Sequence, residues 1–77
     1  MAWSRRLSPP IFLKDGRELK TLSEARDMIL QLPERQQRAA HWLHAGELLL
    51  YAAENDKEAI DDAQRQLSRA LARDGLI

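Results

Sequence analysis

Two histidines are spaced so that they could bind a metal ion or act as a base. His41 and His44 are three residues apart in a stretch with helical periodicity, and Glu47 follows three residues later. Residues at i and i+3 share one face of a helix, so one metal ion could contact both rings. A zinc site needs at least three ligands, and no fourth group is indicated; a base needs a nucleophile or a substrate pocket, and none is evident. We therefore predict no metal, no cofactor and no catalytic residue, with one histidine at the edge of the core and the other exposed.

Three arginines near the C-terminus are also regularly spaced. Arg65, Arg69 and Arg73 follow Asp61 at intervals of four residues. On a helix this spacing forms one stripe that begins with an ion pair. The stripe could contact an acidic partner or phosphate. It could also be a solvated face, since basic residues are favoured at the C-terminal end of a helix. We favour the solvated face and keep the three arginines as candidate anion contacts.

Acidic residues cluster just before this stripe. A calcium loop places oxygen ligands at fixed intervals around a central glycine, and no glycine lies between these residues. We therefore interpret the cluster as helix capping and surface charge. Its members are Glu54, Asp56, Glu58, Asp61 and Asp62.

The element that positions the histidines is a predicted helix from Pro33 to Glu54. Its apolar surface is wider than one flank of a small bundle needs. Either the helix is enclosed between the hairpin and the other helices, or part of its surface is left for another chain. Gly46, in mid-helix, costs about 1 kcal/mol relative to alanine. This suggests close approach of another backbone, within the fold or across a dimer. The candidate interface residues are Trp42, Leu43, Leu49, Leu50 and Tyr51.

A β-hairpin is predicted ahead of the helices. Residues 11–13 and 17–20 form its strands, and residues 14–16 form a turn in which Gly16 can adopt a positive φ. A three-residue loop places the apolar residues of both strands on one face, whereas the competing two-residue loop would divide them. The residues on that face are Ile11, Leu13 and Leu19.

Capping signals delimit the other two helices. Thr21 and Glu24 form a capping box, so a first helix should run from there to about Gln31. A last helix should begin after a cap at Asn55 or Asp56 and run to about residue 73. Gly75 follows at the position of a left-handed cap. The buried positions predicted for these helices are Leu22, Ala25, Met28, Ile29 and Leu32, then Ala59, Ile60, Ala63, Leu67, Ala70 and Leu71.

Together these elements predict one small α+β domain. Residues 1–8 are expected to be a mobile N-terminal arm, and residues 9–77 an N-terminal two-stranded antiparallel hairpin packed on three α-helices. The 77 residues contain no cysteine, which is compatible with a reducing cytoplasm. We see no secretory signal and no apolar stretch of the about 20 residues that a membrane span needs. We therefore expect a cytoplasmic protein.

The charge distribution bears on the partner. The net charge is zero, but residues 1–38 carry eight basic and five acidic groups. This is weaker than the strongly basic surface of most nucleic-acid binders, although a nucleic-acid-associated regulator is the alternative function that we consider. We favour a non-enzymatic protein-interaction module, with a homodimer through the central helix as one form of it. The basic residues of the alternative are Arg5, Arg6, Lys14, Arg17 and Lys20.

Several of these motifs occur together in a known bacterial family. The chain resembles the domain of unknown function 982 family over about residues 9–77. The resemblance implies a packing pattern and no established activity, so no residue role is carried over. The motifs that carry it are Pro10-Ile11-Phe12-Leu13, Thr21, Glu24 and Ala25, Leu32-Pro33, the spaced His41, Ala45 and Ala52, then Ala63, Leu67 and Ala70, and the terminal Gly75-Leu76-Ile77.

Overall fold

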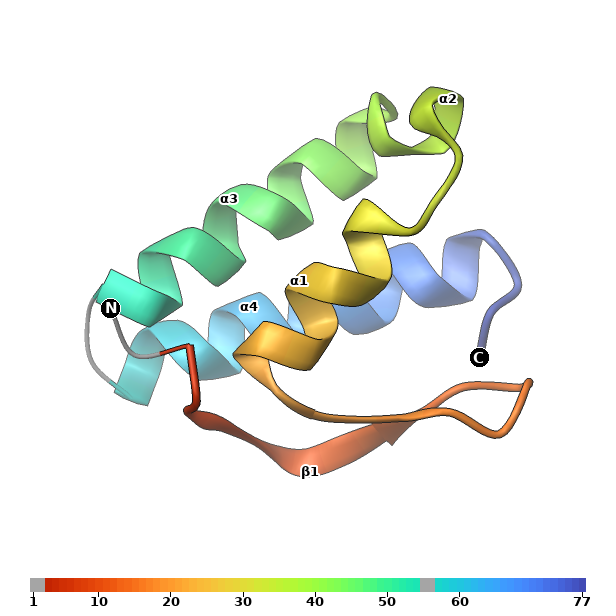
Figure 1. The fold of residues 1–77 in the computed structure, drawn as a ribbon. Coiled ribbons are helices and arrows are strands. Elements are labelled where there is room, and N and C mark those ends of the chain that lie inside the picture. Colours follow the sequence, from red (N-terminus) through yellow and green to blue (C-terminus); the bar gives the residue numbers. More distant parts are fainter. Residues whose placement is uncertain (1–2, 55–56) are drawn as a thin grey trace.

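The computed structural model describes residues 3–54 and 57–77, and the side chains of these except at 57 and 58. The predicted cap at Asn55 or Asp56 therefore lies outside the described residues. The hairpin packs on one side of the helices, which confirms the predicted α+β class (Figure 1). The elements in chain order are β1 (Arg6–Phe12), β2 (Glu18–Thr21), α1 (Leu22–Leu30), α2 (Glu34–Gln37), α3 (Ala40–Glu54) and α4 (Lys57–Arg73).

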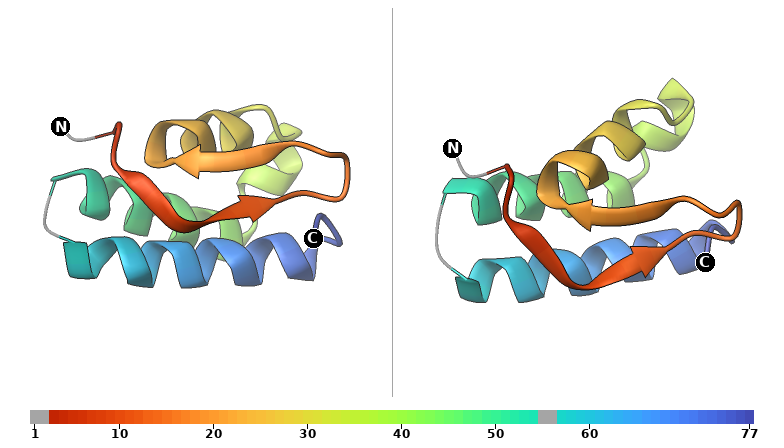
Figure 2. Two further views of the ribbon diagram at one scale, coloured as in Figure 1. Left: turned by 90° about the horizontal axis from the view of Figure 1, so that it is seen from below. Right: turned by 60° about the horizontal axis from the view of Figure 1, so that its bottom comes forward.

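The elements enclose the core as a closed ring. β1 lies beside α4 and β2 beside α1, while α3 contacts both α1 and α4. The view from below shows the hairpin between α1 and α4, with α3 behind (Figure 2). Because every side of the ring contributes apolar residues, one contiguous core forms. Its largest fully buried side chains are Trp42, Leu22, Leu49, Leu67 and Leu71.

The hairpin adopts the predicted three-residue loop. Ile11 pairs with Leu19, and the Leu13 amide donates to the Arg17 carbonyl at 2.9 Å. Gly16 has a φ of 95°, in the left-handed region that the turn requires. Ile11, Leu13 and Leu19 are all at most 7% exposed, so the predicted apolar face is confirmed.

β1 begins earlier than the predicted strand. Leu7 is only 2% exposed, and the Ser23 amide at the start of α1 donates to the Trp3 carbonyl at 2.9 Å. The prediction of a mobile arm is therefore wrong for residues 3–8, which belong to the domain. Residues 1–2 lie outside the described part of the chain.

A glutamine of α4 binds the outer edge of β1. The Ser8 amide donates to Gln64 Oε1 at 3.0 Å, and Gln64 Nε2 donates to the Pro9 carbonyl at 2.5 Å. The side-chain amide thus presents one acceptor and one donor, as a neighbouring strand would. Pro9 and Pro10 have no amide to donate, so Ser8 supplies the only amide of residues 8–10.

The capping box of α1 forms with one difference. Thr21 Oγ1 accepts from the Glu24 amide at 3.2 Å as predicted. The Glu24 carboxylate accepts from the Lys20 amide at 2.8 Å, whereas in a capping box it would accept from the Thr21 amide. Successive residues of a strand direct their backbone groups to opposite edges. The Arg17 carbonyl faces β1, so the Lys20 amide faces away from β1, where Glu24 can reach it.

The single helix predicted from Pro33 to Glu54 is divided in two. A bend at residues 38–39 separates α2 from α3. Gln37 Nε2 donates to the carbonyls of Leu30 and Leu32, at 3.1 and 2.7 Å, and so ties α2 to the end of α1. Contacts between helices therefore override the continuous helical periodicity.

The C-terminal end of α4 closes as predicted. The Gly75 amide donates to the Ala72 carbonyl at 3.1 Å and the Leu76 amide to the Leu71 carbonyl at 2.8 Å, with Gly75 at a φ of 73°. These are the two bonds of a Schellman motif. The Leu76 carbonyl then accepts from the Lys14 amide at 2.9 Å, which attaches the hairpin loop to the end of the chain.

We expect Gln64→Ala to lower the free energy of unfolding by about 1–2 kcal/mol, because it leaves two backbone groups of β1 without their partner. Urea unfolding measures this loss, and hydrogen exchange should show faster exchange of the Ser8 amide. Gln66→Ala is the matched control, since Gln66 also lies on α4 and makes no side-chain hydrogen bond to the described residues. Equal stability of the two variants with unchanged Ser8 exchange would contradict the assignment.

Candidate functional site

The carboxylate of Asp74, just after α4, gathers donors from two other helices. Trp42 Nε1 donates to Asp74 Oδ2 at 2.5 Å and Gln36 Nε2 donates to the same oxygen at 3.4 Å. His41 Nε2 lies 3.1 Å from Asp74 Oδ1. The side chains of Asp74 and His41 are only 18% and 21% exposed. We call these four residues the Asp74 cluster; it joins α2, α3 and α4.

The donors stabilise the ionised form of this carboxylate. The hydrogen bond from Trp42 has the largest effect, and with those from His41 and Gln36 it holds the pKa of Asp74 below its ordinary value of 3.8, against the opposing effect of desolvation. A carboxylate at the C-terminal end of a helix is disfavoured by the helix dipole. The hydrogen bonds from α2 and α3 compensate for that unfavourable position.

The histidine–aspartate pair has no nucleophile beside it among the described residues. Such a pair activates a nucleophile when the second ring nitrogen contacts a hydroxyl or a thiol. No hydroxyl or thiol group of the described residues is hydrogen-bonded to His41. Within the described ranges, no group of three histidine, cysteine, aspartate or glutamate side chains could hold a metal ion. The geometry fits a structural role, in which the Asp74 cluster fastens the bend between α2 and α3 to the end of α4.

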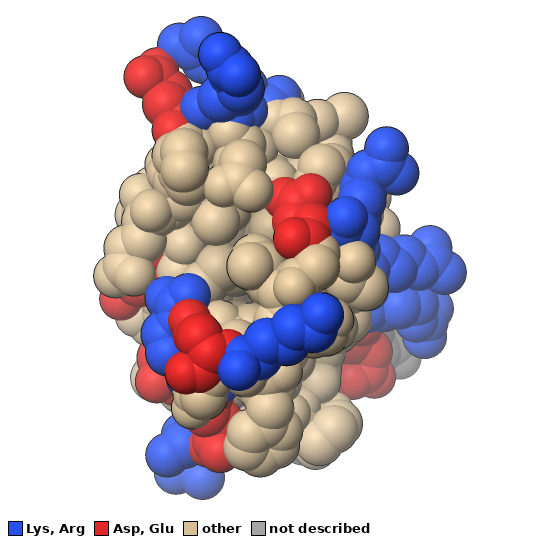
Figure 3. All heavy atoms as spheres, turned by 90° about the vertical axis from the view of Figure 1, so that its right-hand side faces the viewer, with Lys and Arg blue, Asp and Glu red and all other residues tan. Residues whose placement is uncertain are grey.

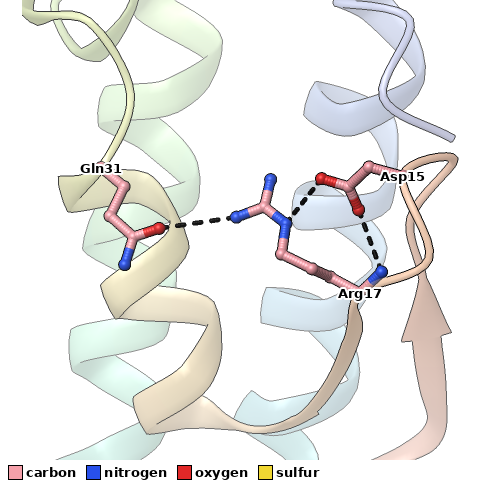
Figure 4. Close-up of polar contacts among 3 residues, drawn as sticks. All are labelled: Asp15, Arg17 and Gln31. Atoms are coloured by element: carbon pink, nitrogen blue, oxygen red, sulfur yellow. Dashed lines mark hydrogen bonds and ion pairs between the residues drawn. The ribbon is translucent and has the colours of Figure 1, made fainter.

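A shallow groove of about 290 Å³ lies between β2 and α1. Leu19 and Met28, both buried, line it together with charged residues. Arg17 Nε donates to Asp15 Oδ2 at 2.7 Å, and Arg17 Nη1 reaches Gln31 Oε1 at 3.5 Å, so a polar bridge links the hairpin to α1 (Figure 4). The Arg17 amide also donates to Asp15, and this bond lowers the pKa of the Asp15 carboxyl. These groups satisfy one another, and the groove shows no specific ligand chemistry.

The outer face of α3 carries large apolar side chains. We define this outer face by Leu43, Leu50 and Tyr51, which are 55%, 44% and 57% exposed. Trp42 and Leu49 were also predicted as interface residues, and for them the prediction is wrong, since each is 1% exposed in the core. Burying one arc of α3 against α1 and α4 leaves the opposite arc, with its three apolar residues, at the surface.

Gly46 lies on the same helix, three residues after Leu43 and four before Leu50. A Cβ built at Gly46 would have no atom within 4 Å apart from its own helix and chain neighbours. The predicted close approach of another backbone within the fold is therefore absent among the described residues. The helical spacing places Gly46 beside the two leucines.

The remaining predicted residues do not form a common site. His41 lies in the Asp74 cluster and His44 is exposed, as predicted for the pair. Arg65, Arg69 and Arg73 are exposed, and none forms an ion pair with a described residue. The predicted pair between Asp61 and Arg65 is not formed, so the stripe is a solvated row of three cations.

Two of the five basic residues considered for nucleic-acid contact are paired with neighbouring carboxylates, while Arg5, Arg6 and Lys14 form no ion pair with a described residue. Arg17 pairs with Asp15 at 2.7 Å, and Lys20 pairs with Glu18 at 3.4 Å. The face near the hairpin loop and the chain end shows basic and acidic side chains interspersed around uncharged surface (Figure 3). The fold therefore does not gather these cations into one basic surface on this face.

Comparison of the chain with protein-family models, with curated proteins and with solved structures finds no match. The resemblance to the domain of unknown function 982 family therefore stays a prediction. None of the described helices is both long and apolar enough to cross a membrane.

Three polar residues that organise the structure were not anticipated from the sequence. They are Asp74, Gln36 and Gln64, whose partners lie 32 or more positions away in the chain. Only Asp74 carries a local signal, because an acidic residue directly before a C-capping glycine opposes the helix dipole and so calls for nearby donors. Nothing local distinguishes the two glutamines from solvated ones.

We expect Asp74→Asn to lower the free energy of unfolding at neutral pH by about 2 kcal/mol, because hydrogen bonds to a charged acceptor are lost. The folded-state pKa of Asp74 lies below 3.8, so its contribution is complete above about pH 5 and is lost as the pH falls through the folded-state value. The difference between wild type and variant should therefore shrink on acidification, as urea unfolding at several pH values would reveal. Asp62→Asn, at an exposed position of α4, is the control. If both variants lose the same small free energy of unfolding at neutral pH, the Asp74 cluster does not stabilise the fold.

Proposed function

We propose that the protein is a non-enzymatic interaction module that associates with a second copy through the outer face of α3. The observation that carries the proposal is the exposure of Leu43, Leu50 and Tyr51 on a helix whose opposite arc already fills the core. Contiguous exposed apolar surface is a feature of interaction sites, whereas single scattered apolar residues are ordinary. Aromatic residues such as Tyr51 are common anchors in protein interfaces.

The size of the domain also supports association. A chain of this length buries only about 60% of the surface of its unfolded form, so its stability is marginal. Association that binds the folded state and not the unfolded state adds stability by mass action. The cysteine-free sequence is compatible with a reducing cytoplasm, where we propose that the module acts.

Association with nucleic acid, the second candidate function, has less support. Exposed Phe12 on β1 could stack on a base, and Lys20 lies on the neighbouring strand β2. However, Lys20 and Arg17 already form ion pairs with carboxylates of the hairpin. Affinity for nucleic acid grows with the number of phosphates neutralised, so paired cations contribute little. Absence of binding to duplex or single-stranded DNA at low salt would remove this candidate.

Sedimentation over a range of protein concentrations tests the proposed association. Wild type should shift from monomer to dimer, and Leu50→Glu should weaken the dimer by about tenfold or more, the effect expected at an apolar anchor. Phe12→Glu is the matched control, because Phe12 is also a large exposed apolar residue, 64% exposed, but lies on β1. A wild type that stays monomeric at high micromolar concentration would refute the proposal. An equal effect of the two substitutions would place the contact elsewhere.

A further inference from the structure

We propose that the second copy packs antiparallel on α3, about a two-fold axis that passes beside Gly46. This inference rests on the proposed function and specifies the geometry of its contact. Three independent features support it: the spacing of the exposed leucines of α3, the open space at its glycine, and the placement of an acidic residue at its C-terminal end opposite the arginines that precede its N-terminal end.

The spacing of the leucines is symmetric. Leu43 and Leu50 are seven residues apart, which is about two turns or 10.5 Å along the helix. The midpoint between them falls between Gly46 and Glu47. A two-fold axis at this point brings Leu43 of each copy onto Leu50 of the other, so the contact between Leu43 and Leu50 forms twice. Such an isologous contact closes on itself as a dimer and leaves no open end for further copies.

The glycine lies where the two helices would cross. Gly46 is at neither a helix end nor a turn, and an added Cβ would meet no atom of the fold within 4 Å. The monomer therefore gains nothing from this glycine, although glycine is disfavoured inside a helix. A second helix that crosses at Gly46 can approach the backbone more closely than at any residue with a side chain.

The charges favour the antiparallel orientation. The acidic side chains of α3 are Glu47 and Glu54, and α3 contains no lysine or arginine. Arg35 and Arg38 lie at the opposite end, in and directly after α2, where with Glu34 they leave one net positive charge. An antiparallel pair brings this basic end beside Glu54 of the other copy, whereas a parallel pair would bring Glu54 beside Glu54.

The ion pair of Arg38 is exposed to solvent, so Arg38 can exchange Glu34 for an acidic residue of the other copy. Arg38 now pairs with Glu34 of its own α2 at 2.6 Å, but both side chains are more than 75% exposed. Charge pairs of this kind set the orientation of a complex more than its affinity. Glu47 lies close to the axis in both orientations and therefore does not distinguish them.

Single-cysteine variants test the orientation, since the chain has no cysteine of its own. Ala40 and Glu54 are exposed near opposite ends of α3. In the antiparallel dimer, Ala40→Cys and Glu54→Cys should each fail to form a disulfide alone, and an equimolar mixture of the two should form a mixed disulfide under mild oxidation. Self-linking of either variant would instead indicate a parallel pair and overturn the orientation while leaving the proposed function intact. A dimer that forms no disulfide in any of these combinations would overturn the proposed axis.

Two further variants separate the contact from the stability of the monomer. Gly46→Ala should raise the urea midpoint of the monomer, because alanine favours the helix and meets no atom of the fold. The same variant should weaken the dimer by about tenfold, since an added methyl group overpacks the crossing point. Glu54→Gln should weaken an antiparallel dimer by about two- to fivefold and strengthen a parallel one. If Gly46→Ala strengthens or leaves unchanged a dimer that Leu50→Glu disrupts, the axis is wrong and the outer face remains the contact.

Discussion

An ionised carboxylate with little access to water must be surrounded by donors, and this constraint organises the helical layer. Asp74 meets it with the indole of Trp42, the ring of His41 and the amide of Gln36. Because these donors come from α2 and α3, their hydrogen bonds to Asp74 hold the bend between those two helices against the C-terminal end of α4. The Schellman motif around Gly75 fixes Asp74 itself, so the local closure of one helix positions two others.

The hairpin depends on a comparable satisfaction of backbone groups. A two-stranded sheet is marginal in water and has two edges with unpaired amides and carbonyls. Here Gln64 binds the β1 edge at Ser8 and Pro9, and Glu24 accepts from the Lys20 amide on the outer edge of β2. The last residues of the chain bind the hairpin loop through Lys14. Side chains of the helices therefore replace the additional strands that a larger sheet would supply.

The Asp74 cluster and the core use only part of the surface of α3. Its inner arc supplies Trp42 and Leu49 to the core, while Leu43, Leu50 and Tyr51 lie outside. Gly46 likewise has no packing role within the described fold. The proposed association with a second copy uses this exposed part of α3, which the core leaves at the surface.

Sequence reasoning alone predicts the α+β class, the hairpin register, the capping of α1 by Thr21 and the closure of α4 at Gly75. Each of these depends on residues a few positions apart, whose turn chemistry and periodicity can be read locally. The folded structure is needed to show that residues 3–8 join the domain, that the long central helix divides, and that Trp42 is buried while Leu43 is exposed. The width of the apolar surface of a helix shows how much of it can be buried. It does not show which arc of the helix will face the core. That choice depends on partners such as Asp74, 32 positions beyond Trp42, which become neighbours only when the chain folds.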